Sequence, residues 1–141
     1  MRAVIQRALG ASVTVAGREV GGFEGAGLVV LLGVTHDDAE SQAQNMARKI
    51  AELRIMRDEQ SAADLAAPIL LISQFTLYGS TKKGRRPSWV AAAPGLVAEP
   101  LVDRVAELLA ERGLPVSQGL FGADMQVSLA NDGPVTVIVD T

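Results

Sequence analysis

Leu28-Val29-Val30-Leu31-Leu32-Gly33-Val34 is the stretch that decides the fold, because none of its side chains is polar or charged. It follows Gly25-Ala26-Gly27, which marks a break in regular structure before it begins. An unbroken apolar run of this length is typical of a strand that is buried on both faces. We therefore expect residues 28–34 to form a strand at the centre of a sheet.

The residues on either side of this strand predict further regular elements. Residues 2–8, 12–16 and 19–24 are expected to form three short strands before it. After it, apolar residues recur at helical spacing and predict an amphipathic helix over 39–53. The preceding Thr35-His36-Asp37-Asp38 offers side chains suited to cap that helix.

The second half of the chain repeats this order of strand and helix. Polar, alanine-rich residues 58–67 are interpreted as a loop, and Ile69-Leu70-Leu71-Ile72 as a second buried strand. Residues 79–87 form a glycine- and lysine-rich loop. A second helix is expected to have Pro100 in its first turn and to stop at Gly113.

Length and composition indicate one domain over residues 1–141, since 48% of the residues are hydrophobic and no linker interrupts them. The elements predict an α/β fold with a mixed sheet and two main helices on one side. There is no cysteine, which excludes disulfides, thiolate metal sites and a cysteine nucleophile. Met1–Arg7 is too polar for a signal peptide and no apolar run is long enough to span a membrane, so a cytoplasmic protein is expected.

Asn131-Asp132-Gly133-Pro134-Val135-Thr136 can be interpreted in two ways. Strand-like residues 125–129 and 135–139 flank it, which predicts a hairpin turn. However, an X-Pro bond can be cis at modest cost, and glycine leaves backbone carbonyls free to face a ligand. A rigid Gly133-Pro134 wall could then reject a ligand by its handedness.

Ser73-Gln74-Phe75-Thr76 offers hydroxyl, amide and backbone N–H groups where a buried strand ends, which is where α/β proteins place catalytic groups. Local hydrogen bonding is the simpler interpretation. A Ser-His-acid triad is disfavoured, because the only histidine is His36 and no glycine-x-serine elbow surrounds Ser73. His36 beside two acidic residues is better explained by helix capping than by metal binding. We expect neither a metal nor a cofactor.

The net charge of −3 argues against general binding of nucleic acid. Even so, Lys82, Lys83, Arg85 and Arg86 lie within five positions and precede Trp89. They are either a solvated turn or phosphate contacts beside a stacking surface.

Phe121 and Met125 stand next to flexible glycines. They are either core residues or the walls of a slot for a nucleobase.

Together these motifs resemble the signature of the D-aminoacyl-tRNA deacylases. The resemblance rests on Ser73–Tyr78 and Asn131–Thr136, supported by Met1–Arg7, Arg86-Pro87-Ser88 and Phe121–Met125, in the order and spacing of that family. The likeness runs nearly end to end. The chain departs from the common family form in a shorter loop between Arg57 and Pro68, and in Arg85 and Trp89, where asparagine and phenylalanine are expected.

The resemblance implies a fold of barrel-like β layers and a homodimer whose active sites lie at the subunit interface. It implies hydrolysis of the ester between a D-amino acid and the terminal ribose of tRNA, with glycine also accepted. In such a dimer a cis Gly133-Pro134 bond, held by Arg7, reaches into the partner's site and excludes L-amino acids.

Other roles are implied for the rest of the signature. Ser73–Thr76 would line the pocket for the amino acid, and Phe121 and Met125 would hold the terminal adenine. Backbone N–H groups near Phe75 and Thr76 are the expected oxyanion donors. Thr76 is expected to position substrate, because a threonine without a neighbouring base is poorly activated as a nucleophile. A non-catalytic nucleic-acid-binding module and a small-molecule esterase are the alternatives.

Overall fold

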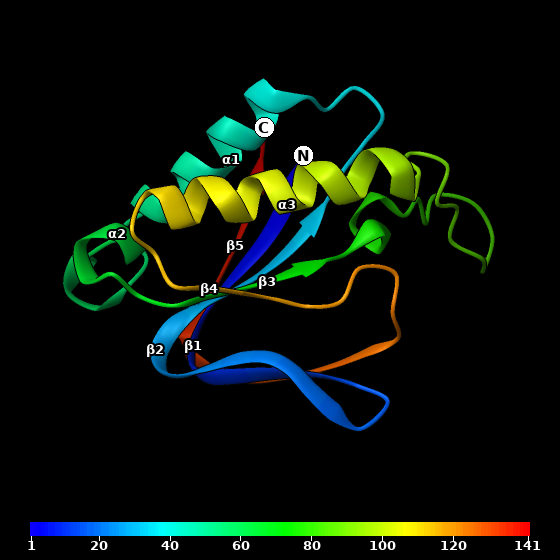
Figure 1. The fold of residues 1–141 in the computed structure, drawn as a ribbon. Helices are drawn as coiled ribbons and strands as arrows, with labels where there is room; N and C mark the ends of the chain where they lie inside the picture. The colour runs from blue at the N-terminus through cyan, green and yellow to red at the C-terminus, as the bar shows by residue number, and fades with distance from the viewer.

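A computed structural model describes residues 1–141 as one five-stranded sheet, in the strand order β4-β3-β2-β1-β5. The two long helices, α1 and α3, cover one face of this sheet (Figure 1). The predicted α/β class, with a mixed sheet and helices on one side, is confirmed. The elements are, in chain order, β1 Arg2–Val15, β2 Arg18–Gly33, α1 Glu40–Glu52, η1 Arg57–Glu59, α2 Ala62–Leu65, β3 Ile69–Ser73, η2 Phe75–Tyr78, α3 Gly95–Glu111, β4 Val116–Gln118 and β5 Met125–Asp140.

The four strands expected over residues 2–34 are in fact two long ones, β1 and β2. They pair antiparallel along most of their length, and β5 pairs antiparallel with the other edge of β1. The strand pairing shifts register beside Gly10, whose φ of +84° is one that glycine adopts readily. The glycines interpreted as strand ends therefore lie within bulged, continuous strands.

The sheet curls until the first half of β2 reaches β4. The hydroxyl of Ser117 in β4 donates to the carbonyl of Gly22 at 3.0 Å. A Cβ on Gly21 would lie 2.6 Å from the backbone oxygen of Gln118, so only glycine permits this close approach. The curl produces the barrel-like second layer that the family resemblance implied (Figure 1).

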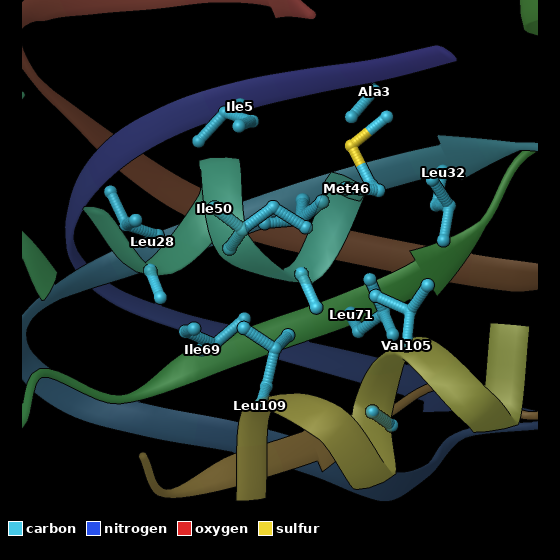
Figure 2. Packing of buried hydrophobic residues seen from close by; sticks show 14 of the residues in the cluster. Ala3, Ile5, Leu28, Leu32, Met46, Ile50, Ile69, Leu71, Val105 and Leu109 are labelled. Carbon is cyan, nitrogen blue, oxygen red and sulfur yellow. The ribbon is translucent and has the colours of Figure 1, made fainter. Parts of the chain in front are cut away.

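Two apolar cores lie on opposite faces of β3. Ile69 and Leu71 face the larger core, where they pack with Ile50 of α1 and Leu109 of α3 (Figure 2). Leu70 and Ile72 face a smaller core inside the curled sheet. This double burial explains why residues 69–72 are all apolar rather than alternating, and the predicted strand is confirmed.

Helix α1 matches the predicted range, but its cap was wrongly assigned to residues 35–38. Ala39 occupies the N-cap position, and its N–H donates to the side chain of Gln42 at 3.0 Å. Asp38 instead accepts from the N–H of Thr35 at 2.7 Å and contacts the amino group of Met1. The His36 ring contacts the carbonyl oxygen of Val90 at 2.8 Å, on the surface.

The second long helix begins earlier than predicted. Helix α3 starts at Gly95, where the N–H groups of Val97 and Ala98 both donate to Pro94 at 2.9 Å. Pro100 therefore lies inside the helix, which continues because its buried face packs on the sheet. Gly113, with φ +82°, follows the helix end as expected.

Residues 58–67 are also more ordered than the predicted loop. They include parts of the single-turn helices η1 and α2, and the Ser61 hydroxyl caps α2 by accepting from the N–H of Asp64 at 3.1 Å. Single turns are too short to show periodicity in the sequence. Among all the helices, none is long and apolar enough to cross a membrane.

Replacing Leu71 by alanine is expected to lower the free energy of unfolding by about 2–5 kcal/mol, because the side chain is removed from a packed core. The matched control is Leu96→Ala in α3, where the side chain is 94% exposed. This control should change stability by less than about 0.5 kcal/mol. Urea unfolding followed by circular dichroism measures both values, and equal effects would contradict the assignment of the core.

Candidate active site

The segment after β3 presents backbone N–H groups at the surface. The N–H of Gln74 donates to Leu32 at 2.8 Å, and the chain then enters the η2 turn at Phe75. The backbone N–H groups of Phe75 and Thr76 begin this turn, and neither donates a hydrogen bond within the chain. The side-chain amide of Gln74 donates to the Thr76 hydroxyl, which orients both groups. The turn therefore offers two adjacent unpaired donors.

Tyr78 anchors the end of this turn to the sheet. A Cβ on Gly33 would lie 3.2 Å from Cδ2 of Tyr78, so the ring packs closely on the backbone there. The Arg2 guanidinium lies 5.7 Å from the ring centroid. Burial, and next the negative charge of Asp38, raise the pKa of Tyr78 to about 12, although Arg2 opposes the shift.

Two hollows flank the turn and share Ser73, Gln74 and Phe75. One, of about 160 Å³, lies against α3 and includes Phe121. The other, of about 260 Å³, includes Met125 at the start of β5. The structure thus brings Ser73–Phe75, Phe121 and Met125 together, although they are about fifty residues apart in sequence.

The basic loop borders the same region. Ser80 and Ser88 exchange backbone hydrogen bonds of 2.8 and 3.0 Å, which close the base of the loop. Trp89 then packs edge-on against Phe75, with ring centroids 5.5 Å apart. The four basic side chains are exposed and none forms an ion pair with the chain; they are Lys82, Lys83, Arg85 and Arg86.

The Gly133-Pro134 stretch is a bulge in β5, so the predicted hairpin turn is wrong. Residues on both sides of it pair with β1, since Asn131 is opposite Ala8 and Thr136 is opposite Gln6. One residue of β1 therefore faces four residues of β5, and the extra length bows outward. The peptide bond between Gly133 and Pro134 is cis, and both residues are exposed on the edge strand of the sheet.

Arg7 is the β1 residue that faces this bulge. Its guanidinium donates to the carbonyl of Ile55 at 3.0 Å and lies 2.9 Å from the carboxylate of Asp132. A Cβ on Gly133 would come within 2.9 Å of the same guanidinium. Asn131 closes the base of the bulge by donating to the carbonyls of Arg7 and Val135. Arg7 thus contacts Asp132 and lies against the Gly133 side of the bulge.

The Gly133-Pro134 bulge does not lie at the Ser73–Thr76 turn of the same chain. Arg7 pairs with Leu28 of β2, which pairs with Ile69 of β3. Ile69 is four residues before the end of β3, and β5 lies three strands away from β3 in the sheet. With about 3.3 Å per residue and about 4.8 Å per strand, the two motifs are roughly 20 Å apart. At this separation the two motifs do not line one small-molecule pocket within a single chain.

Comparison with known proteins shows the family to which the chain belongs. A model of the family described as D-Tyr-tRNA(Tyr) deacylase matches residues 4–140. The chain is 62% identical over 140 residues to a D-aminoacyl-tRNA deacylase of Kineococcus radiotolerans, with 99% of each chain covered. It is 60% identical over 140 residues to one of Streptomyces coelicolor, again with 99% of each covered.

Two solved structures share the fold. One is described as "c-Myc DNA Unwinding Element Binding Protein", with TM-score 0.91 and 39% identity over 100% of this chain and 99% of the other. The second, described as "Structural Analysis of a probable eukaryotic D-amino acid tRNA deacylase", has TM-score 0.85 and 18% identity over 99% and 98%. At that identity the second likeness concerns the fold alone.

The chain belongs to the D-Tyr-tRNA(Tyr) deacylase family and is an enzyme of the hydrolase class. The family resemblance identified from its motifs is confirmed.

Some residues around the site were not apparent in the sequence. Ala93, Gly95 and Ala98 line the hollow beside Phe121, but small residues in an Ala-Pro-Gly context give no functional signal. The contact between Arg57 and Asp132 was also missed. The position of Asp132 immediately before Gly133-Pro134 was the one available hint.

Tyr78 is the only tyrosine, so its ionisation can be followed directly by ultraviolet absorbance. We expect a midpoint near 12 in the folded protein and near the ordinary 10.0 in urea. Because the unfolded phenol ionises first, the free energy of unfolding should fall as pH rises from 10 towards 12. Tyr78→Phe should abolish the absorbance change, and a folded-state midpoint near 10 would contradict the packing described here.

Proposed function

We propose that this chain hydrolyses the ester that joins a D-amino acid to the terminal ribose of tRNA. Water attacks the ester carbonyl, the acyl C–O bond breaks, and the ribose oxygen leaves with a proton. The observation that carries the proposal is the Ser73–Thr76 turn, whose unpaired N–H groups border hollows lined by Phe121 and Met125. Membership of the deacylase family supports it.

An aminoacyl ester is already activated, so binding and charge stabilisation are sufficient for catalysis. The backbone N–H groups of Phe75 and Thr76 would stabilise the oxyanion, an effect typically worth about 3–4 kcal/mol for one donor. Gln74 and Ser73 would hold the amino acid, and Thr76 positions substrate because no base activates its hydroxyl. The 2′-hydroxyl of the substrate ribose would assist the attacking water.

The RNA end of the substrate would occupy the surface around this turn. The terminal adenine would bind between Phe121 and Met125, which border the two hollows. Phosphates would approach the exposed basic loop, whose side chains have no internal ion pairs; they are Lys82, Lys83, Arg85 and Arg86.

Handedness would be read by a second copy of the chain in a homodimer. The Gly133-Pro134 bulge is exposed on an edge strand, and Arg7 contacts it. Because the bulge is roughly 20 Å from Ser73 in the same chain, it would reach the partner's site, where its carbonyls exclude an L side chain. Glycine has no side chain to exclude, so glycyl-tRNA mischarged on tRNA(Ala) would also be hydrolysed. The reaction would take place in the cytoplasm as chirality proofreading for translation.

Purified protein is expected to release D-tyrosine from D-tyrosyl-tRNA and to leave L-tyrosyl-tRNA intact, with a chelator present. Pro134→Ala should raise release of the L form in a folded protein, because the wall is weakened. Pro115→Ala is the matched control, since this proline is also exposed but lies before β4. Release of radiolabelled amino acid measures each rate.

Other outcomes would favour the alternatives. Salt-sensitive binding of both forms without release would indicate a nucleic-acid-binding module, a function that the name of one structural neighbour gives to that protein. Equal release of both forms would indicate a hydrolase without chirality selection. Cleavage of free amino-acid esters without tRNA would indicate a small-molecule esterase.

The shared site can be tested by cross-linking, because the chain has no cysteine of its own. Phe75→Cys and Pro134→Cys proteins, mixed to allow subunit exchange, should yield covalent dimers with a short bis-maleimide. Each variant alone is the control and should yield few. A monomer in light scattering, or a mixture that links no better than the controls, would contradict the proposed dimer.

A further inference from the structure

Arg57 reaches the Gly133-Pro134 bulge from a segment far away in sequence. Its guanidinium donates to Asp132 Oδ1 at 2.6 Å, although most of the Arg57 side chain is exposed. Asp132 itself is buried, with 8% of its surface exposed, and directly precedes Gly133. The Asp132 carboxylate therefore joins the exposed Arg57 side chain to the residue that begins the Gly133-Pro134 bulge.

The two arginines hold Asp132 in different ways. Arg7 Nε lies 2.9 Å from Asp132 Oδ2, but it is buried without a hydrogen-bond partner, so this ion pair lacks the alignment of a hydrogen bond. The contact from Arg57 to Oδ1 has the geometry of a hydrogen bond. The hydrogen bond from Arg57 and then the charges of Arg57 and Arg7 hold the pKa of Asp132 below its ordinary value, against the effect of burial. The carboxylate thus takes its direction mainly from Arg57.

The backbone around Arg57 is itself fixed. The N–H of Met56 donates to the carbonyl of Gln60 at 2.9 Å, and the N–H of Gln60 donates back to Arg57 at 3.3 Å. Between Arg57 and Gln60, both Asp58 and Glu59 have φ near +55°. Non-glycine residues rarely adopt this left-handed conformation, and it makes the turn tight. Ile55, just before this turn, accepts from Arg7 at 3.0 Å. The segment therefore contacts both Arg7 and Asp132.

We propose that Arg57 is a positioning residue that sets the orientation of Gly133-Pro134 through Asp132, and so sharpens discrimination between D- and L-aminoacyl-tRNA. This inference rests on the proposed function. The contacts of Arg57, Asp132 and Arg7 form a closed clamp on the bulge. Without Arg57 the carboxylate keeps only its ion pair with Arg7, and the bulge is held less firmly although Asn131 still closes its base.

The test compares Arg57→Ala with Arg48→Ala, a control arginine that is also exposed and pairs only with neighbours on α1. In Arg57→Ala the ratio of D to L deacylation, as kcat/KM, should fall about three- to tenfold, the effect of losing one charged hydrogen bond that is partly exposed. Arg48→Ala should leave the ratio unchanged. Arg57→Lys keeps the charge and should restore part of it.

A second measurement does not depend on catalysis. Hydrogen exchange at the amides of Gly133 and Val135 should be faster in Arg57→Ala than in wild type or in Arg48→Ala. In an Asp132→Asn background, Arg57→Ala should have little further effect on exchange or on the ratio, because the two residues act as one unit. Thermal unfolding verifies that every variant is folded.

The possible results separate the inference from the proposed function. Unchanged exchange, or an unchanged D to L ratio, in folded Arg57→Ala overturns the positioning role. The positioning role is also overturned if Arg57→Ala lowers the D to L ratio as much in the Asp132→Asn background as in wild type, since Arg57 would then act by another route. A wild type with no preference between D and L substrates refutes the proposed function and the specificity role together, even if exchange shows that the clamp exists.

Discussion

The burial of β3 on both faces is the constraint on which the rest of the structure depends. Ile69 and Leu71 pack beneath the helices, while Leu70 and Ile72 fill the curled sheet. A shift of one residue would exchange the two sets of side chains between differently shaped cores, so the register of β3 is strongly determined. Because β3 cannot slide, the turn that follows it is held at one place, and its unpaired N–H groups are pre-positioned.

The same sheet keeps the two signature motifs of this deacylase-family enzyme apart. The Ser73–Thr76 turn follows an inner strand, whereas Gly133-Pro134 bows out of the edge strand β5. A motif on an edge can be presented to another molecule without breaking any pairing within the sheet. This geometry is the physical basis of the proposed shared site, in which one subunit supplies the oxyanion donors and its partner supplies the Gly133-Pro134 carbonyls that exclude an L side chain.

The local sequence predicts an element correctly where burial imposes a simple periodicity on its apolar residues. The apolar runs at 28–34 and 69–72 predicted buried strands, and helical spacing predicted α1 almost to the residue. Such prediction failed where glycine and proline allow several local structures. Gly133-Pro134 predicted a hairpin turn, but both flanking segments pair with β1, so the feature is a bulge. Pro100 predicted a helix start, but packing of the apolar face overrides that local signal.

The sequence by itself determined the α/β class, the identity of the two motifs and the family, because these depend on residue types and their order. Only the tertiary structure decided what each motif lies beside. It joined Phe121 and Met125 to the Ser73–Phe75 turn, and it joined Arg7 and Arg57 to Asp132. Such contacts depend on strand register and on the curl of the sheet, which arise from long-range pairing that no local window of sequence contains.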